Sequence, residues 1–335
     1  MGALVATHTD RIARISSSRQ GPGEVLASSS VIAMSQPDQP SLRVATLNAG
    51  SLLEPDWKNR RHEIVAWLDE LHPDIVCLQE VWETPDKINT ARWIAEHSSG
   101  DWHVAVGARP FGPHVLDDPT LLFGSAVLSR WKIDAEHYEP LTLDPMDSDP
   151  FLSAIPFELL HVQTAGLDIG SVHLAPAPTQ SLHRQAQVLQ IDRYFRSIRG
   201  DADAIPPPGT VRDAMPAILC GDFNAEPDSD EIRFLCSLTP LAGHTTFWQD
   251  AWRMAGDGLG YTQDWRTNAI ADAMNIGRKR IDYVFVGDPY QRRGAGGRIL
   301  ATRLAFHESR TGVVASDHFG VVADIVWPQR PEGHA

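Results

Sequence analysis

Apolar and polar positions alternate densely from residue 42 onward, and this pattern predicts many short strands with two intervening helices. Short apolar runs and period-two alternation predict strands. The predicted strand segments are 42–50, 74–82, 102–110, 124–133, a hairpin over 160–176 that turns near 165–166, 214–224, 279–288 and 318–327. Apolar residues spaced three and four apart predict amphipathic helices at 57–72 and 180–198.

The order of these elements predicts one α+β domain over residues 41–328. Gly- and Pro-rich loops separate the elements, but neither a repeat nor a linker divides the chain. Many strands with a few interspersed helices favour two sheets packed face to face with helices outside. Residues 1–40 are rich in Ser, Gly and Ala with little periodicity, so we expect a disordered extension there. Residues 329–335 form a short tail.

Composition and charge narrow the class of protein. The chain has 335 residues, of which 42% are hydrophobic and 21% charged, as in ordinary globular proteins. A net charge of −14 provides no general basic field, which disfavours tight non-specific binding to nucleic acid. Cys77 and Cys220 lie inside apolar runs, and we interpret both as reduced core residues. The sequence shows neither a signal-peptide pattern nor a transmembrane segment, so we expect a cytoplasmic monomer.

Polar residues able to bind a metal or move a proton border or interrupt six of the apolar runs. A single aspartate after a strand usually forms a turn or a helix cap, but the same chemistry at six runs is hard to ascribe to turns alone. If the strands lie side by side, these positions converge on one edge. They are Asn48, Glu80, His173, Asp222 with Asn224, Asp282, and Asp317 with His318.

The chemistry of these side chains predicts a hydrolytic metal site. Carboxylate and amide oxygens suit Mg²⁺ or Mn²⁺, and Glu80 is the best candidate for the principal ligand. His173 and His318 can transfer protons near neutral pH, and Asp282 could hold one imidazole in a single tautomer. The sequence has neither a GxSxG motif nor a plausible cysteine nucleophile. Water activated by a metal and a base is therefore the expected nucleophile.

The motifs TLNAG, CLQEVW, GSAVLSR, SVHLAP, LCGDFNAEP, RIDYVFV and SDHFGVVADI resemble, in this order, those of the endonuclease/exonuclease/phosphatase superfamily. This superfamily includes enzymes similar to deoxyribonuclease I and exonuclease III, neutral sphingomyelinase and inositol polyphosphate 5-phosphatases. The resemblance covers about residues 42–327. It implies a four-layer α/β/β/α sandwich of two mainly antiparallel sheets with outer helices. It also implies hydrolysis of a phosphoester, most simply a phosphodiester, that depends on Mg²⁺ or Mn²⁺.

The resemblance also implies a role for each motif residue. Asn48, Glu80 and Asp317 match metal-binding positions, with Glu80 as a direct ligand. His173 matches a histidine that contacts the phosphate or protonates the leaving oxygen. Asp222 matches the aspartate that orients or deprotonates water, and Asn224 matches an amide bonded to the phosphate. Asp282 and His318 match an Asp–His pair beside the scissile phosphate. Whether Asp222 or His318 is the general base is left open.

The sequence says less about the substrate. Arg278, Arg280 and Trp265 are candidate substrate contacts, the arginines for a phosphate backbone and the indole for stacking. The candidate substrates are a nucleic acid, a phospholipid headgroup as in sphingomyelinases, and a small phosphodiester or inositol phosphate. A scaffold protein that retains this fold without catalysis is the alternative. The complete set of motif residues favours the enzyme, because a degenerate member would be expected to lack some of them.

Overall fold

The computed structural model describes residues 39–331, apart from positions 85, 87 and 208 and the segments 111–119, 145–149 and 200–206. The described residues belong to one unit, Asp38–Ala335. The predicted extension at 1–40 lies outside the described residues up to position 38, and so does the end of the predicted tail at 332–335. Among the described helices, none is long and apolar enough to cross a membrane.

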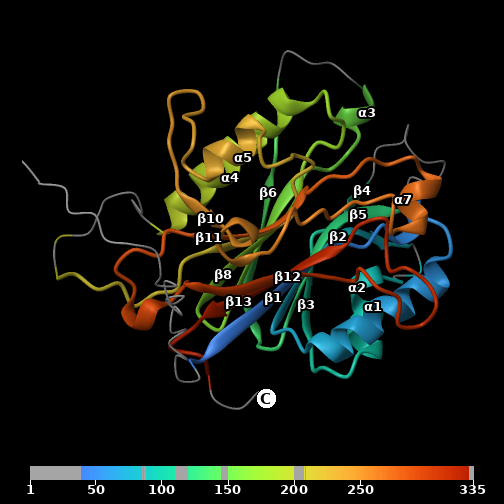
Figure 1. Ribbon diagram of the computed structural model, residues 1–335, viewed down its shortest axis with the longest axis horizontal. Helices are drawn as coiled ribbons and strands as arrows, with labels where there is room; N and C mark the ends of the chain where they lie inside the picture. Colours follow the sequence, from blue (N-terminus) through green and yellow to red (C-terminus); the bar gives the residue numbers. More distant parts are fainter. Residues whose placement is uncertain are drawn as a thin grey trace, which may run out of the picture. The chain divides into compact units, whose positions relative to one another are not determined.

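Two mixed sheets form the centre of this unit (Figure 1). The first sheet has the order β12-β13-β1-β2-β5-β3, with β4 also pairing with β5. Its strands are β1 Ser41–Asn48, β2 Ile75–Glu83, β3 His103–Val106, β4 Arg109–Pro110, β5 Leu122–Ser129, β12 Ile299–Ala305 and β13 Gly320–Val326. The second sheet has the order β10-β11-β9-β8-β7-β6. Its strands are β6 Ile133–Pro140, β7 Glu158–Thr164, β8 Leu167–His173, β9 Ile218–Asp222, β10 Trp248–Asp250 and β11 Asp282–Gly287.

Helices cover the outer faces of both sheets, which confirms the predicted α+β sandwich (Figure 1). The helices are α1 Trp57–Leu71, α2 Thr90–His97, α3 Pro150–Ser153, α4 Ser181–Arg199, α5 Asp230–Leu235, α6 Ala251–Ala255, α7 Ala269–Ala273 and the 3₁₀ turns η1 Ser51–Leu53 and η2 Arg293–Ala295. One apolar core lies between the sheets. A second core joins α1 and α2 to the first sheet, and a third joins α4 and α5 to the second.

Each sheet contains one parallel pair, and both pairs matter for the site. Strand β1 runs parallel to β2, and β8 runs parallel to β9. The remaining pairs are antiparallel. The carboxyl ends of parallel neighbours lie at the same edge of a sheet. Both parallel pairs therefore bring two strand ends together at one edge.

Gly221 permits the close approach of β8 and β9. Its φ of 144° is rare for residues with a side chain, and a Cβ there would lie 2.0 Å from the Val172 carbonyl oxygen. The register pairs Val172 with Gly221 and His173 with Asp222. The glycine of the GDFN motif thus sets the position of the aspartate that follows it.

The strands that the hydrophobic pattern missed are edge strands. Strands β6, β10 and β12 end the two sheet paths and were not predicted. The predicted strand 124–133 is in fact β5, which ends at Ser129, followed by a turn and the separate edge strand β6. Most residues of β6 are exposed or half-buried. An edge strand that buries little surface carries a weak apolar signal.

Glu158, at the start of β7, is a buried carboxylic acid between two glycines. A Cβ on Gly107 would lie 2.2 Å from Glu158 Oε1, and one on Gly124 would lie 2.9 Å away. The same oxygen has no hydrogen-bond partner in the structure. Burial raises the pKa of Glu158 from 4.5 to about 8, although Arg109 acts to lower it. The folded protein therefore holds Glu158 as a neutral acid at pH 7.

We expect Glu158→Gln to stabilise the fold at high pH but not at low pH. Between pH 4.5 and 8 the unfolded chain releases the Glu158 proton while the folded chain retains it, so the wild type loses stability as pH rises. The variant lacks this loss, and its advantage should grow by up to about 1.4 kcal/mol for each pH unit. Urea unfolding of both proteins at pH 5.5, 7 and 8.5 measures this difference.

The exposed Glu136 of β6 provides a matched control, because Glu136→Gln removes a carboxylate from the surface of the neighbouring strand. A stability difference between Glu158→Gln and wild type that stays constant with pH would contradict the buried neutral acid.

Candidate active site

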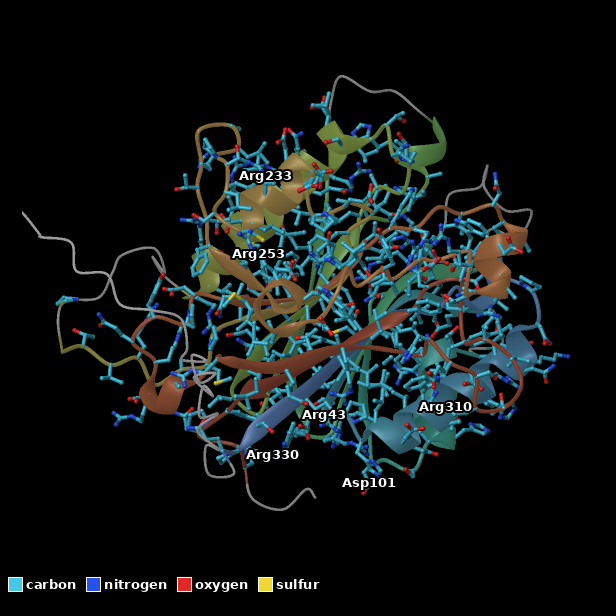
Figure 2. The ribbon with its side chains drawn as sticks, viewed as in Figure 1. Arg43, Asp101, Arg233, Arg253, Arg310 and Arg330 are labelled. Carbon is cyan, nitrogen blue, oxygen red and sulfur yellow. The ribbon has the colours of Figure 1, made fainter. Side chains whose placement is uncertain are left out.

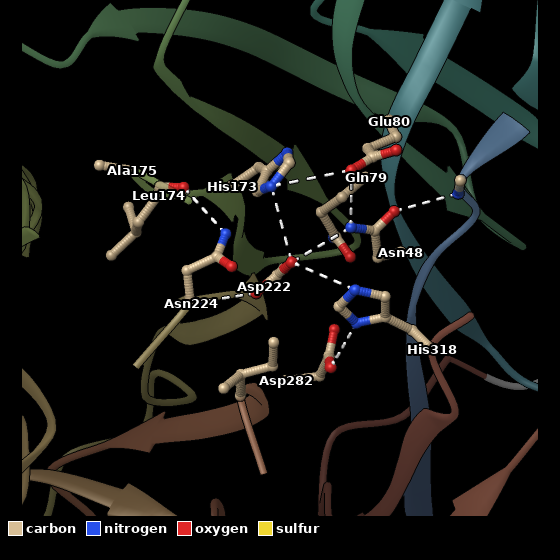
Figure 3. A network of polar contacts seen from close by, with 12 residues as sticks. Asn48, Gln79, Glu80, His173, Leu174, Ala175, Asp222, Asn224, Asp282 and His318 are labelled. Carbon is tan, nitrogen blue, oxygen red and sulfur yellow. Dashed lines mark hydrogen bonds and ion pairs between the residues drawn. The ribbon is translucent and has the colours of Figure 1, made fainter. Parts of the chain in front are cut away.

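The predicted site residues converge where the two sheets meet at their parallel strand ends (Figure 3). Asn48 and Glu80 come from β1 and β2 of the first sheet, and His173 and Asp222 end β8 and β9 of the second. Asp282 begins β11, opposite Asp222 in the register. Asp317 and His318 precede β13, which is antiparallel to β1. The structure thus brings together residues from six separate strands.

Asn48 bridges two carboxylates from different sheets. Its Nδ2 donates to Glu80 Oε1 and to Asp222 Oδ2, both at 3.1 Å. Its Oδ1 accepts from the backbone N–H of Gly50 at 3.0 Å. The amide nitrogen, rather than the oxygen, therefore faces the carboxylates. In this geometry Asn48 holds Glu80 and Asp222 together, and its contact with a metal stays a prediction.

Glu80 occupies an irregular position within β2. The pairing of β2 with β5 shifts register between Leu78 and Val81, and Glu80 has a φ of 56°. Such a conformation costs about 1–3 kcal/mol in a residue with a side chain, and its surroundings must impose it. Ser51 Oγ donates to the Glu80 carbonyl at 2.7 Å and helps to hold it. The bulge turns the Glu80 side chain toward the second sheet.

Gln79 links the two sheets directly beneath the site. Its Oε1 accepts from Thr46 Oγ1 at 3.3 Å in the first sheet, and its Nε2 donates to Ser171 Oγ at 3.1 Å in the second. These groups are buried, so each hydrogen bond satisfies an otherwise costly polar atom. This link fixes the spacing between the sheets where Glu80 and His173 face each other.

Asp222 lies at the centre of the site and is almost fully buried. Its Oδ1 accepts from the backbone N–H of Asn224 at 2.8 Å. Its Oδ2 lies 3.5 Å from His173 Nε2 and 3.8 Å from His318 Nε2. Asn224 has a φ of 50° and donates through Nδ2 to the Leu174 carbonyl at 3.1 Å. Asp222 therefore lies between two imidazoles, His173 and His318, that can exchange a proton with it.

His318 and Asp282 form a buried pair. His318 Nδ1 lies 2.9 Å from Asp282 Oδ2, and Asp282 Oδ1 has no hydrogen-bond partner. The same imidazole presents Nε2 to Gln263 Nε2 at 2.9 Å and to Asp317 Oδ2 at 3.8 Å. The expected pairing of these two residues is thus present in the structure. Asp282 fixes the orientation of the ring, whose Nε2 faces the centre of the site.

Two residues that the sequence analysis missed support Asp317. Glu54 Oε2 accepts from the Asp317 backbone N–H at 3.1 Å, and Arg60 Nη1 lies 3.3 Å from that carboxylate oxygen. Gln263 Nε2 donates to Asp317 Oδ2 at 3.2 Å. Glu54 and Gln263 lie in irregular segments without an apolar run, so the strand-end pattern gave no signal for them.

Burial and mutual repulsion shift the proton affinities in the site. Burial, followed by the charge of Asp282, raises the pKa of Asp222 to about 7. Burial also raises the pKa of Glu80. Burial acts to lower the pKa of His318, but the carboxylates of Asp282, Asp317 and Asp222 together raise it well above its usual value. Burial lowers the pKa of His173. The neighbouring carboxylates therefore favour protonation of His318, and burial disfavours protonation of His173.

The donor set suits a divalent cation. Within the described part of the chain, five carboxylates gather around the site, namely Glu54, Glu80, Asp222, Asp282 and Asp317. One arginine, Arg60, and two imidazoles face them. Burial raises the pKa of Glu54 to about 9, so Glu54 adds no charge at pH 7. The other four acidic groups are costly to ionise together in the interior unless a cation offsets them. Ligand atoms of Asp222, Asp282 and His318 lie within 4.8 Å of one another and could hold an ion. The pairing of His318 with Asp282 leaves this trio less free to ligate than Glu80 and Asp317.

The predicted substrate contacts lie outside this cluster. Arg280 is buried, and its Nη1 and Nη2 donate to both carboxylate oxygens of Asp250 at 3.1 and 2.8 Å. This pairing is at odds with a substrate contact by Arg280, because both Nη atoms already donate to Asp250. Asp250 lies outside the RIDYVFV motif, so the sequence pattern gave no sign of this partner. Arg278 Nε donates to Asp264 at 2.9 Å but stays partly exposed. Trp265 is exposed and available to a ligand.

Comparisons with known proteins agree with this architecture. A model of the Endonuclease/Exonuclease/phosphatase family matches residues 45–318. No curated protein sequence matches the chain. A Leptotrichia buccalis protein of the endonuclease/exonuclease/phosphatase family has a TM-score of 0.58 at 18% identity, covering 85% of this chain and 100% of its own. TDP2 from D. rerio, complexed with a single-strand DNA product, has a TM-score of 0.59 at 19% identity, and the match covers 85% of this chain and 98% of its own. The human Nocturnin catalytic domain with a bound sulfate has a TM-score of 0.58 at 19% identity, and the match covers 86% of this chain and 94% of its own.

Proposed function

The chain belongs to the endonuclease/exonuclease/phosphatase family, and from this membership we propose that it hydrolyses a phosphoester with the help of a divalent cation. The observation that carries the proposal is the set of five carboxylates and two imidazoles gathered at one edge of the sandwich. Glu80 and Asp317 would hold the cation. When bound, Mg²⁺ or Mn²⁺ supplies charge that polarises the phosphoryl oxygens.

Asp222 is the residue we propose as the base for the attacking water. It is central, it is held by Asn48 and the Asn224 backbone, and its pKa of about 7 suits proton transfer near neutral pH. His318 is better suited to stabilise negative charge, because three carboxylates favour its protonated form. We therefore propose Asp222 as the base and His318 as the residue that stabilises negative charge.

His173 and Asn224 complete the proposed site on the second sheet. His173 Nε2 lies 4.0 Å from Glu80 Oε1 and 3.5 Å from Asp222 Oδ2, so it faces the same space as both carboxylates. There it can donate to a phosphoryl or leaving-group oxygen. Asn224 uses one N–H of its amide on the Leu174 carbonyl, and its second N–H is left for the phosphate.

The substrate class stays open between nucleic acid, phospholipid headgroup and small phosphodiester. The D. rerio TDP2 structure with a single-strand DNA product supports the nucleic-acid candidate. Against it, the arginines at positions 278 and 280 are both paired with carboxylates, and the chain carries a net charge of −14. A polyanion gains most of its affinity from unpaired cations on the protein. We therefore propose a phosphodiester as the substrate.

The test is a substrate panel with and without metal. The purified protein is dialysed against EDTA and assayed with bis-(p-nitrophenyl) phosphate, plasmid DNA, sphingomyelin and inositol phosphates, before and after Mg²⁺ or Mn²⁺ is restored. We expect hydrolysis of at least one substrate only after metal is restored, because the carboxylate excess needs a cation. An Asp222→Asn preparation serves as the control for contaminating hydrolases.

Two results would contradict the proposal in different ways. Full activity in EDTA would remove the metal assignment while leaving hydrolysis intact. No hydrolysis of any substrate by folded protein with metal would favour the scaffold alternative, in which the fold persists without catalysis.

A further inference from the structure

A small cavity lies at the end of the second sheet opposite the active site. It is lined by residues at the end of α4, before β9 and after β11, and its volume is about 40 Å³. One water needs about 10–15 Å³ on this scale, so the cavity has room for a small anion or a few waters. Asp222 and Ile218 are four residues apart on β9, which places the two ends of the strand about 13 Å apart.

Aromatic and cationic side chains line this cavity. Phe195, Phe247 and Trp248 form its apolar wall. Arg196, Arg199 and Arg292 bring guanidinium groups to it. The apolar wall lowers the local dielectric constant around the guanidinium groups. A lower dielectric constant strengthens the attraction of these cations for an anion.

The carboxylates in and near the cavity are already paired with arginines. Asp192 Oδ2 accepts from Arg196 Nε at 2.7 Å, and Asp288 Oδ2 accepts from Arg212 Nη2 at 2.7 Å. Asp168, outside the cavity lining, is the partner of Arg199. Arg196, Arg199 and Arg212 each have a carboxylate partner. Among the residues that the structure describes, Arg292 forms no ion pair with a carboxylate, although Asp288 lies near enough to attract it.

Among the described residues, the hydrogen-bond partners of Arg292 are backbone carbonyls. Its Nε donates to the Asp288 carbonyl at 3.2 Å, and its Nη1 donates to the Ala214 carbonyl. Burial, followed by the charges of Arg212 and Arg199, lowers the pKa of Arg292 to about 10. A partly buried guanidinium that is repelled by two others is unfavourable without a counter-ion.

We propose that this cavity is an anion site in which Arg292, with Arg199 beside it, binds an oxyanion of phosphate size. The unused N–H groups of a guanidinium form a planar fork that matches two oxygens of a phosphate or sulfate. The limited volume selects a small oxyanion over a nucleotide. The site is separate from the catalytic residues and does not depend on the proposed hydrolysis.

The test compares thermal unfolding in sodium phosphate and in sodium chloride at equal ionic strength, with EDTA present. We expect phosphate to raise the Tm of the wild type saturably, by about 3–5 °C at tenfold excess over its dissociation constant. Arg292→Gln should lose most of this rise. Arg253→Gln provides the matched control, because Arg253 is an exposed arginine of α6 (Figure 2) and should leave the rise unchanged.

The same variants distinguish an anion site from a structural arginine. In chloride, Arg292→Gln should unfold at the wild-type temperature or above it, because repulsion by Arg199 and Arg212 is removed. An equal loss of Tm in both salts would overturn the proposal, as would a phosphate effect that Arg292→Gln retains or a wild type that phosphate does not stabilise beyond chloride. If Arg292→Gln does not fold, Arg292→Lys keeps the charge without the planar fork and should weaken the phosphate effect.

Discussion

Replacement of His318 by alanine is expected to lower kcat by roughly 10²–10⁴-fold, the scale of a lost acid–base or oriented electrostatic group. The physical reason is the buried pair in which His318 Nδ1 lies 2.9 Å from Asp282 Oδ2, while Nε2 faces the site centre. Removing the ring leaves Asp282 buried without its partner and removes the imidazole nitrogen that faces Asp222.

Asp282→Asn should also be slow, because an amide stabilises a different tautomer of the imidazole and no longer supports its charge. The double variant should lose little more than the worse single variant, since both residues act through one unit. The measurement is kcat for both single variants and the double variant, after circular dichroism has shown that all three are folded. Losses that multiply in the double variant would mean that the two residues act independently.

A second His–Asp pair, with a buried imidazole and a half-buried carboxylate, provides the control for structural damage. His161 Nε2 lies 3.0 Å from Asp168 Oδ1 in the second sheet, away from the site residues. His161→Ala removes a pair with a similar separation and a similarly buried imidazole, but it should leave kcat within about threefold of wild type. A loss of kcat as large as that of His318→Ala would mean that the assay reports disruption of the fold instead of a catalytic role.

The candidate site residues stand out in the sequence because each interrupts or borders an apolar run that folds as a central strand. Central strands bury both faces, so they appear in the sequence as nearly continuous apolar runs. A polar residue at the border of an apolar run is therefore easy to recognise. Their convergence was harder to predict, because it depends on which strands pair. Asn48 and Glu80 meet through the parallel pairing of β1 and β2, and His173 and Asp222 through that of β8 and β9.

The parts that could not be predicted lack such a local signal. Edge strands β6, β10 and β12 pair on one side only, and β6 is mostly exposed or half-buried, so its alternation is weak. Glu54 and Gln263 reach Asp317 from irregular segments. The Arg280 prediction failed to anticipate Asp250, which lies 30 positions earlier and neutralises it in the interior. Long-range ion pairs of this kind leave no pattern in a single sequence.

Glu80→Gln is expected to raise the Mg²⁺ concentration for half-maximal activity by at least tenfold. The substitution removes one charge but little volume, so it weakens the Coulomb attraction for a cation without opening a cavity. Glu80 accepts from Asn48 through Oε1 and sits in a backbone conformation that the β2 bulge imposes. A neutral amide keeps this packing, and it should also relieve the repulsion that Asp317 exerts on the carboxylate.

Titrating activity with Mg²⁺ from EDTA-treated protein separates this effect from a loss of folding. Glu83→Gln is the matched control, because Glu83 lies on the same strand three positions further on, is also half-buried, and faces Asn89 instead of the site. If Glu80 is the principal ligand, saturating Mg²⁺ should restore part of the lost rate in Glu80→Gln, while the midpoint for Glu83→Gln stays at the wild-type value. An unchanged midpoint in Glu80→Gln would move the cation to the Asp222, Asp282 and His318 trio, whose atoms are also close enough to hold it.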